Sequence, residues 1–127
     1  ELEKQILKWR KNNTKLIIVG TKDHTDILSR CINGFLNLDI TGLVDIGKND
    51  QHEKQNIKYA TLNWNDLNNI QYDEILISSH EYMYDILDIL NEKQINKPIY
   101  QIYDNASRSF LDILKDFPSY FSESDNK

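Results

Sequence analysis

The pattern of apolar and polar positions divides this chain into short segments with two different periods. Two continuous apolar runs, residues 15–20 and 73–79, are typical of strands that are covered on both faces of a parallel sheet. The segments 39–45, 57–60 and 97–103 predict three further strands, because each stands between polar turns. The sequence therefore predicts five strands, joined by segments of helical period.

In the joining segments, apolar residues recur every three or four positions, which is the spacing of one helix face. Leu2, Ile6 and Trp9 form such a stripe near the start of the chain. Short polar residues and capping boxes mark where several of these helices begin. The predicted helices cover residues 2–11, 24–36 and 64–68, the last capped by Asn63 with Asp66, then a segment after Ser78-x-x-Glu81 and a segment from Asn105 to Pro118.

Strands and helices that alternate with short connections predict an α/β fold with a parallel sheet and right-handed crossovers. We expect a Rossmann-like, doubly wound sheet with the strand order 3-2-1-4-5, between helices on both faces. In such a three-layer αβα fold the winding reverses between the strands 15–20 and 73–79. The crevice outside the carboxyl ends of those two strands is the usual ligand site.

The length of 127 residues fits one folded domain. We expect an N-terminal helix in 1–14, the Rossmann-like domain in 15–118 and a polar tail in 119–127. Because the chain opens on Glu1 rather than Met, it is expected to be part of a longer protein. A single cysteine, Cys31, cannot form an internal disulfide and suits a buried thiol in the cytoplasm.

Charge and hydropathy limit the partners that this chain is expected to bind. The net charge of −5 disfavours nucleic acid, which needs a dense basic surface. No apolar run approaches the roughly 20 residues that span a membrane, so no membrane insertion is expected. The lysines of the N-terminal segment are interpreted as the solvated side of a helix.

The loop after the first strand, Gly20-Thr-Lys-Asp-His-Thr25, can be compared with the dinucleotide fingerprint G-x-G-x-x-G. Only the first glycine is present, since Lys22 stands at the second glycine position and Thr25 at the third. Two interpretations remain open. Either Lys22 attracts phosphate in a modified site, or Gly20 only ends a strand while Asp23 or Thr25 caps a helix.

Asp45 ends the second predicted strand, 25 residues after Gly20. An acidic side chain at that place accepts hydrogen bonds from a ribose diol in nucleotide-binding sheets. It is also an ordinary residue for the end of a strand. Asp45 therefore favours a nucleoside ligand only in combination with Gly20.

Two histidines, His24 and His80, follow strands that we place side by side. Such a pair could bind phosphate, shuttle a proton or ligate a metal. No cysteine or carboxylate accompanies them at ligand spacing, so no metal is expected. Ser78 and Ser79 are better explained as helix caps than as nucleophiles, and the catalytic residues stay unknown. Tyr103, after the last strand, could also reach a ligand.

The strand pattern of residues 15–104 resembles the small Rossmann-like domain of bacterial polysaccharide-biosynthesis proteins. That group includes the N-terminal domains of membrane-associated nucleotide-sugar epimerases and dehydratases, and of sugar O-acyltransferases. The resemblance rests on the segments Lys15-Leu-Ile-Ile-Val-Gly20, Ile40-Thr-Gly-Leu-Val-Asp45, Tyr72-Asp-Glu-Ile-Leu-Ile-Ser-Ser79 and Ile99-Tyr-Gln-Ile-Tyr103. Members usually keep a second glycine in the first loop, where this chain has Lys22.

The resemblance implies a site for a nucleotide, with NAD(P) or a nucleotide-sugar as the ligand. The residues that it implies are Gly20, Thr21, Lys22, His24, Asp45, Ser78, Ser79 and His80. The leading hypothesis is a binding domain from surface-sugar metabolism that is not catalytic by itself.

Two other hypotheses stay open. The first is a degenerate scaffold or oligomerisation domain, appended to a glycosyltransferase, a methyltransferase or another sugar-modifying enzyme. The missing glycines and the aromatic N-terminal helix favour it, with a homodimer or a missing domain of the same polypeptide as the partner. The second is a small enzyme that uses His24 and His80.

Overall fold

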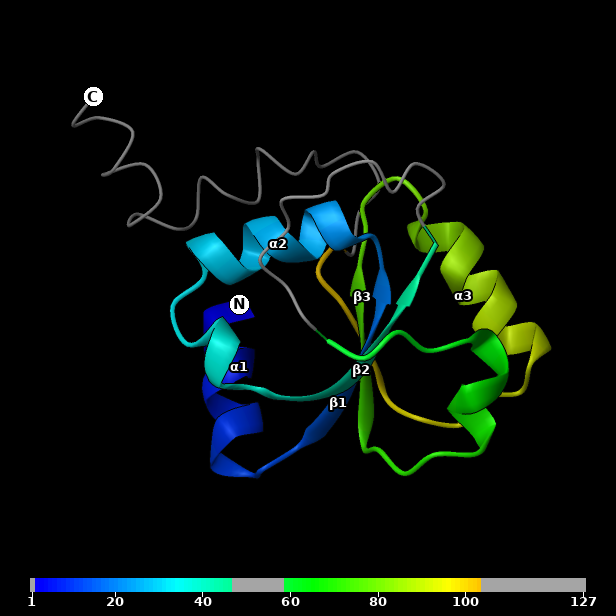
Figure 1. Ribbon diagram of the computed structural model, residues 1–127, viewed down its shortest axis with the longest axis horizontal. Coiled ribbons are helices and arrows are strands. Elements are labelled where there is room, and N and C mark those ends of the chain that lie inside the picture. Colours follow the sequence, from blue (N-terminus) through cyan, green and yellow to red (C-terminus); the bar gives the residue numbers. More distant parts are fainter. Residues whose placement is uncertain (1, 47–58, 104–127) are drawn as a thin grey trace.

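The computed structural model of the protein describes residues 2–46 and 59–103, in which helices and strands alternate (Figure 1). The predicted helix from Asn105 to Pro118 lies outside these residues. The α-helices are α1 (Leu2–Lys11), α2 (Lys22–Cys31) and α3 (Met83–Glu92); the strands are β1 (Lys15–Gly20), β2 (Asp39–Asp45), β3 (Glu74–Ser78) and β4 (Ile99–Gln101); and the short 3-10 helices are η1 (Phe35–Asn37) and η2 (Trp64–Asn68).

The strands of the described residues form one parallel sheet in the order β2-β1-β3-β4. β1 lies in the middle, paired with β2 on one side and with β3 on the other. This sheet confirms the α/β class and is compatible with a Rossmann-like fold. It does not have the predicted five strands in the order 3-2-1-4-5, because the described residues form only four.

The predicted strand at 57–60 accounts for that difference. Its described part, residues 59 and 60, is not a strand, and the chain makes only an isolated parallel bridge from Leu43 to Thr61. Pairing ends there because the Asn63 N–H donates a hydrogen bond of 2.9 Å to the Asp66 carboxylate, which begins η2. The predicted brief helix at 64–68 is thus confirmed, as a 3-10 helix.

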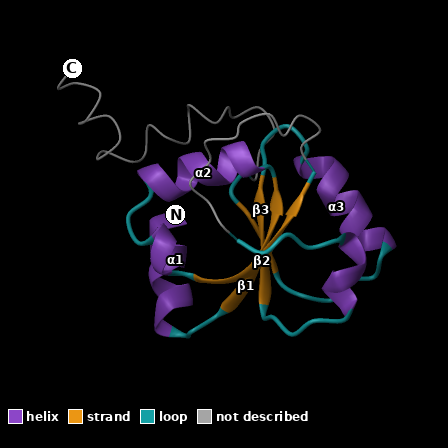
Figure 2. Ribbon diagram, viewed as in Figure 1, coloured by secondary structure: helices purple, strands orange, loops and turns teal. Residues whose placement is uncertain are grey.

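Helices cover both faces of the sheet, which Figure 2 shows edge-on. α1 and α2 lie on one face, whereas α3 and η2 lie on the other. The predicted stripe of Leu2, Ile6 and Trp9 is buried, and the Trp9 ring meets Tyr100 of β4 edge to face at 5.4 Å. The N-terminal helix therefore belongs to the same hydrophobic core as the sheet.

The helix predicted at 24–36 begins and ends earlier than its apolar pattern indicates. It begins at Lys22, because the Thr21 side chain caps it by accepting the His24 N–H at 3.2 Å. The expectation that Asp23 or Thr25 caps this helix is therefore wrong. α2 ends at Cys31, and Gly34 then turns the chain with a φ of 86°.

The junction between β3 and α3 also differs from the prediction. Ser78 does not form a capping box with Glu81, because the Ser78 hydroxyl is buried in side-chain contacts with α2. Ser79 is the residue whose hydroxyl accepts a backbone N–H, from Tyr82 at 3.0 Å. α3 then begins at Met83.

Among the described residues, the structure contains no helix that is both long enough and apolar enough to cross a membrane.

Candidate functional site at the carboxyl edge of the sheet

The predicted site residues come from three strand ends and the turns that follow them. Gly20 at the end of β1 lies opposite Asp45 of β2 and also opposite Ser78 of β3. Because parallel strands end at the same edge of a sheet, the residues that follow them gather there as well. The structure thus places Thr21, Lys22, His24, Ser79 and His80 at this same edge of the sheet.

Gly20 is required by the close approach of β1 to β3. A Cβ atom at this position would overlap the carbonyl oxygen of Ser78 and lie 2.5 Å from its carbonyl carbon. The next residue, Thr21, donates its N–H to the same Ser78 oxygen at 3.1 Å. The space beside Gly20 is therefore filled by the backbone of β3, which explains this glycine without a pyrophosphate.

His24 lies at the centre of a buried group of hydroxyls. Its Nδ1 is 2.7 Å from the Ser78 hydroxyl, and its Nε2 is 2.7 Å from the Tyr103 hydroxyl. The Thr25 hydroxyl lies 2.8 Å from Ser78 and 2.8 Å from the carbonyl oxygen of Thr21. We call the side chains of His24, Thr25, Ser78 and Tyr103 the histidine network.

One arrangement of hydrogens satisfies all four contacts of the histidine network. The Thr21 carbonyl can only accept, so Thr25 donates to it and must accept from the Ser78 hydroxyl. Ser78 then accepts from Nδ1–H of His24, and Nε2 accepts from the Tyr103 hydroxyl. This assignment makes His24 a neutral imidazole with its hydrogen on Nδ1.

Burial keeps His24 in that neutral form. Removal from water, together with the smaller effect of nearby His80, lowers the pKa of His24 from 6.5 to about 3. Burial also raises the pKa of the Tyr103 hydroxyl, which stays protonated as the donor to Nε2. His24 is therefore a poor proton shuttle near neutral pH, because its pKa lies far from 7 and both ring nitrogens are engaged.

His80 approaches the histidine network from the solvent side. It is half-buried, and its ring meets that of Tyr103 edge to face at 4.8 Å. The His24 ring also lies edge to face with the ring of the same tyrosine, at 5.6 Å between ring centroids. Tyr103 thus lies in contact with both histidines. The described residues contain no group of three or more His, Cys, Asp or Glu side chains placed to hold a metal ion.

Lys22 and Asp45 form the more accessible part of this edge. The Lys22 ammonium lies 3.9 Å from the Asp45 carboxylate, and their side chains are 30% and 13% exposed. This separation exceeds hydrogen-bond distance, so the contact is a weak ion pair. The first-loop lysine and the acidic residue of β2, which were predicted to serve phosphate and ribose, thus face each other.

A pocket of about 340 Å³ opens beside Asp45. Its walls come from the end of β2, from the turn into η2 and from the residue after α3. We call it the Trp64 pocket; it is lined by Val44, Asp45, Leu62, Asn63, Trp64, Asn65 and Lys93. Of these residues, only Asp45 was predicted to belong to the site. The setting of Trp64 between two asparagines is the signal in the sequence that points to this pocket.

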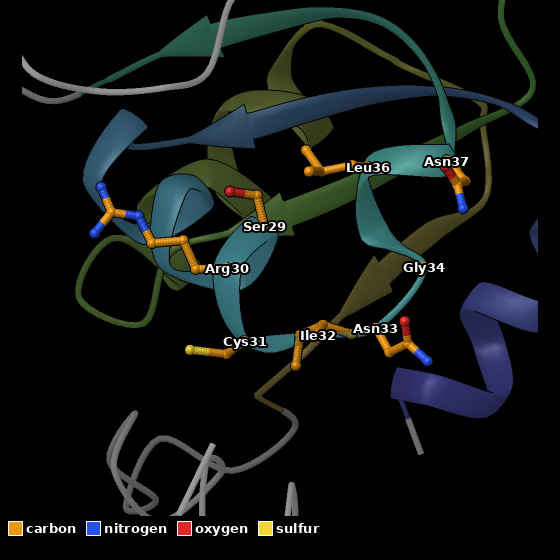
Figure 3. Close-up of a pocket in the computed structure, with 8 residues that line it drawn as sticks. All are labelled: Ser29, Arg30, Cys31, Ile32, Asn33, Gly34, Leu36 and Asn37. Atoms are coloured by element: carbon orange, nitrogen blue, oxygen red, sulfur yellow. The ribbon is translucent and has the colours of Figure 1, made fainter. Parts of the chain in front are cut away.

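A second pocket, of about 480 Å³, lies where α2 passes into η1 (Figure 3). The polar side chains of Arg30 and Asn33 point away from each other there. Arg30 is also held by Asp26 at 2.8 Å. Because the polar groups do not converge, this pocket lacks the arrangement expected of a ligand site.

Comparison with known proteins gives no assignment, since no family model, no curated protein and no solved structure matches this chain. The resemblance to polysaccharide-biosynthesis domains therefore stays a prediction from the strand pattern.

Proposed function

We propose that this chain is a nucleotide- or nucleotide-sugar-binding domain that is not catalytic by itself. The observation that carries the proposal is the position of Lys22 and Asp45 at the carboxyl edge of the sheet, beside β1, the strand from which the winding reverses toward β3. Ligands of open α/β sheets bind outside the carboxyl ends of the strands at such a reversal. The proposed ligand is either a nucleotide-sugar or NAD(P).

The two side chains supply complementary chemistry for such a ligand. A carboxylate only accepts hydrogen bonds, so Asp45 suits the two hydroxyls of a ribose. Lys22 lies in the first turn of α2, where the helix dipole adds partial positive charge to that of the ammonium. A phosphate group near Lys22 and a ribose near Asp45 would belong to one ligand, because the two side chains are adjacent.

The histidine network supports the non-catalytic part of the proposal. Ser78 and His24 are separated by 2.7 Å, which is the distance between a nucleophile and its base in hydrolases. Ser78 is completely buried, however, and a substrate could not reach its hydroxyl. The pKa of His24, about 3, is likewise far below that of a base that works near pH 7.

A scaffold that binds no ligand is the alternative, and the closure of Gly20 against Ser78 favours it. In that case the domain would be appended to a sugar-modifying enzyme and would contact a second copy or another domain. The context of surface-polysaccharide metabolism rests only on the resemblance of the strands.

Titration of the chain with NAD, UDP-N-acetylglucosamine and a CMP-sugar, followed by amide NMR, tests the proposal. We expect one ligand to shift the amides of Lys22 and Asp45, and Asp45→Asn to weaken its binding about tenfold. Asp88→Asn, an exposed change on α3 with the same loss of charge, is the control and should bind as the parent does. If every ligand leaves these amides unshifted, the scaffold is correct and the binding proposal is wrong.

A further inference from the structure

We infer that the Trp64 pocket receives the base and ribose of a nucleoside phosphate, along the outer edge of β2. This inference rests on the proposed function. It assigns the ligand to the end of β2 rather than to the crevice between β1 and β3. It extends the site to Trp64 and Lys93, which the strand pattern did not indicate.

The space available favours the Trp64 pocket over the crevice between β1 and β3. In the crevice, the backbone of Ser78 already fills the position beside Gly20, and the side chains of His24 and Tyr103 are buried behind it. The Trp64 pocket offers about 340 Å³, at the lower end of the range for small-molecule sites. One base with its ribose suits that volume, whereas a complete dinucleotide does not.

The walls of the Trp64 pocket match the parts of a nucleoside. Trp64 and Leu62 give an apolar surface, and both are half-buried, so each keeps part of its side chain accessible. An indole ring stacks on any base, because every base has a π-face. Asn63 and Asn65 add donors and acceptors at the rim, where polar edges of a base need partners.

The charges of the Trp64 pocket favour a ligand that also carries phosphate. Asp45 provides a hydrogen-bond acceptor for the ribose hydroxyls at the end of β2. Lys93 adds an ammonium to the same pocket, and Lys22 lies 3.9 Å from Asp45 at its border. A neutral nucleoside would use only the apolar wall and Asp45, so the phosphate is expected to increase the affinity through the lysines.

Fluorine NMR of the chain labelled with 5-fluorotryptophan tests this inference. The chain has two tryptophans, Trp64 in the pocket and Trp9, which is 2% exposed on the buried face of α1. UDP, uridine, AMP and adenosine are the probes. We expect a nucleotide to shift the Trp64 resonance and to leave that of Trp9 unchanged.

Variants then separate stacking from charge. Trp64→Leu should weaken the binding of UDP or AMP about tenfold, as expected for the loss of one stacked base, whereas Trp64→Phe should retain most of it. Lys93→Gln should weaken the binding of UDP or AMP but leave the binding of uridine or adenosine unchanged. Tyr84→Leu removes an aromatic ring that is 57% exposed on α3 and should change nothing. Thermal unfolding of each variant confirms that it is folded.

The outcomes distinguish this inference from the proposed function. A shift of Trp64 together with weaker binding by Trp64→Leu supports both. A ligand that shifts the amides of Lys22 and Asp45 but neither shifts Trp64 nor responds to Trp64→Leu overturns the inference and leaves the proposed function standing. If no probe and no nucleotide-sugar binds, the proposed function fails and the inference fails with it.

Discussion

The two halves of the carboxyl edge use similar polar residues for different purposes. At the ends of β1 and β3, the histidine network is buried and each of its contacts is 2.7 or 2.8 Å. At the end of β2, Lys22 and Asp45 are partly exposed and 3.9 Å apart, beside an open pocket. We call the first the closed half, because its polar groups are packed inside the protein, and the second the open half, because its charged groups stay partly exposed. Proximity of polar residues at a sheet edge is therefore not enough to identify a binding site.

Burial explains why the two halves differ. A buried polar group must be hydrogen-bonded, or its desolvation destabilises the fold. The histidine network meets this requirement with neutral groups. Burial keeps His24 uncharged, and both of its ring nitrogens stay hydrogen-bonded. Lys22 and Asp45 are partly exposed, so they keep their charges without the full cost of burial.

Replacement of Gly20 by alanine tests the closed half most severely. The new Cβ would overlap the backbone of Ser78, which cannot move without separating β1 from β3. We expect the free energy of unfolding to fall by about 3 kcal/mol or more, measured by urea denaturation. Gly42→Ala is the comparison, because its nearest neighbours are the Cδ1 and Cγ atoms of the Leu62 side chain at 2.6 Å and the backbone enters only at 2.9 Å, through the Ala60 oxygen, so it should cost less. If both variants lost the same unfolding free energy, the close approach of β1 to β3 would not be what requires a glycine at position 20.

Removal of the Ser78 hydroxyl should have the next largest effect. Ser78→Ala removes the hydroxyl that accepts the Nδ1–H of buried His24, and the loss of such a buried hydrogen bond should lower the free energy of unfolding by about 2 kcal/mol. The control is Ser29→Ala, whose hydroxyl donates to the Asp26 carbonyl on a half-buried part of α2, and which should change stability by less than about 0.5 kcal/mol. A Ser78→Ala variant as stable as the parent would contradict the proposed arrangement of hydrogens.

The difference between the two halves could be predicted from the sequence only in part. Hydrophobic periodicity located most strands and helices, because apolar runs and stripes report the buried faces directly. It missed the buried polar face of α2, where His24 and Thr25 lie beside Leu28. An apolar stripe gives no sign of a neutral histidine in the core, since its partners Ser78 and Tyr103 are 54 and 79 residues away.

The same limit applies to the open half. Asp45 was identified from its place at the end of β2, which is a local signal. The contribution of Lys93 to the Trp64 pocket depends on how α3 packs against η2, and that packing is not encoded in any motif. The described part of the predicted third strand, residues 59 and 60, is not a strand for a local reason, because Asn63 and Asp66 begin η2 directly after the bridge at Thr61.

Acid should weaken the closed half through His24. Its pKa is about 3 in the folded protein and 6.5 when exposed, so below pH 6.5 the unfolded chain binds a proton that the folded chain does not. The free energy of unfolding is therefore unaffected by His24 well above pH 6.5. As the pH falls from 6.5 toward 3, it decreases by about 1.4 kcal/mol per pH unit. Unfolding free energies at pH 7, 6 and 5.5 measure the slope. His24→Gln should remove it, and His80→Gln should retain most of it; a slope that survives His24→Gln would assign it to other groups.

The smallest effect on stability is expected in the open half. Lys22→Gln should change the unfolding free energy by less than about 0.5 kcal/mol, because a pair at 3.9 Å that remains partly exposed contributes little. The control is Lys8→Gln on the exposed side of α1. A double-mutant cycle with Asp45→Asn isolates the coupling of the pair by urea denaturation. A coupling above 1 kcal/mol would mean that the end of β2 is fixed to α2 as firmly as β3 is. In that case the open half would also be packing, and the scaffold would explain the whole sheet edge better than a nucleotide does.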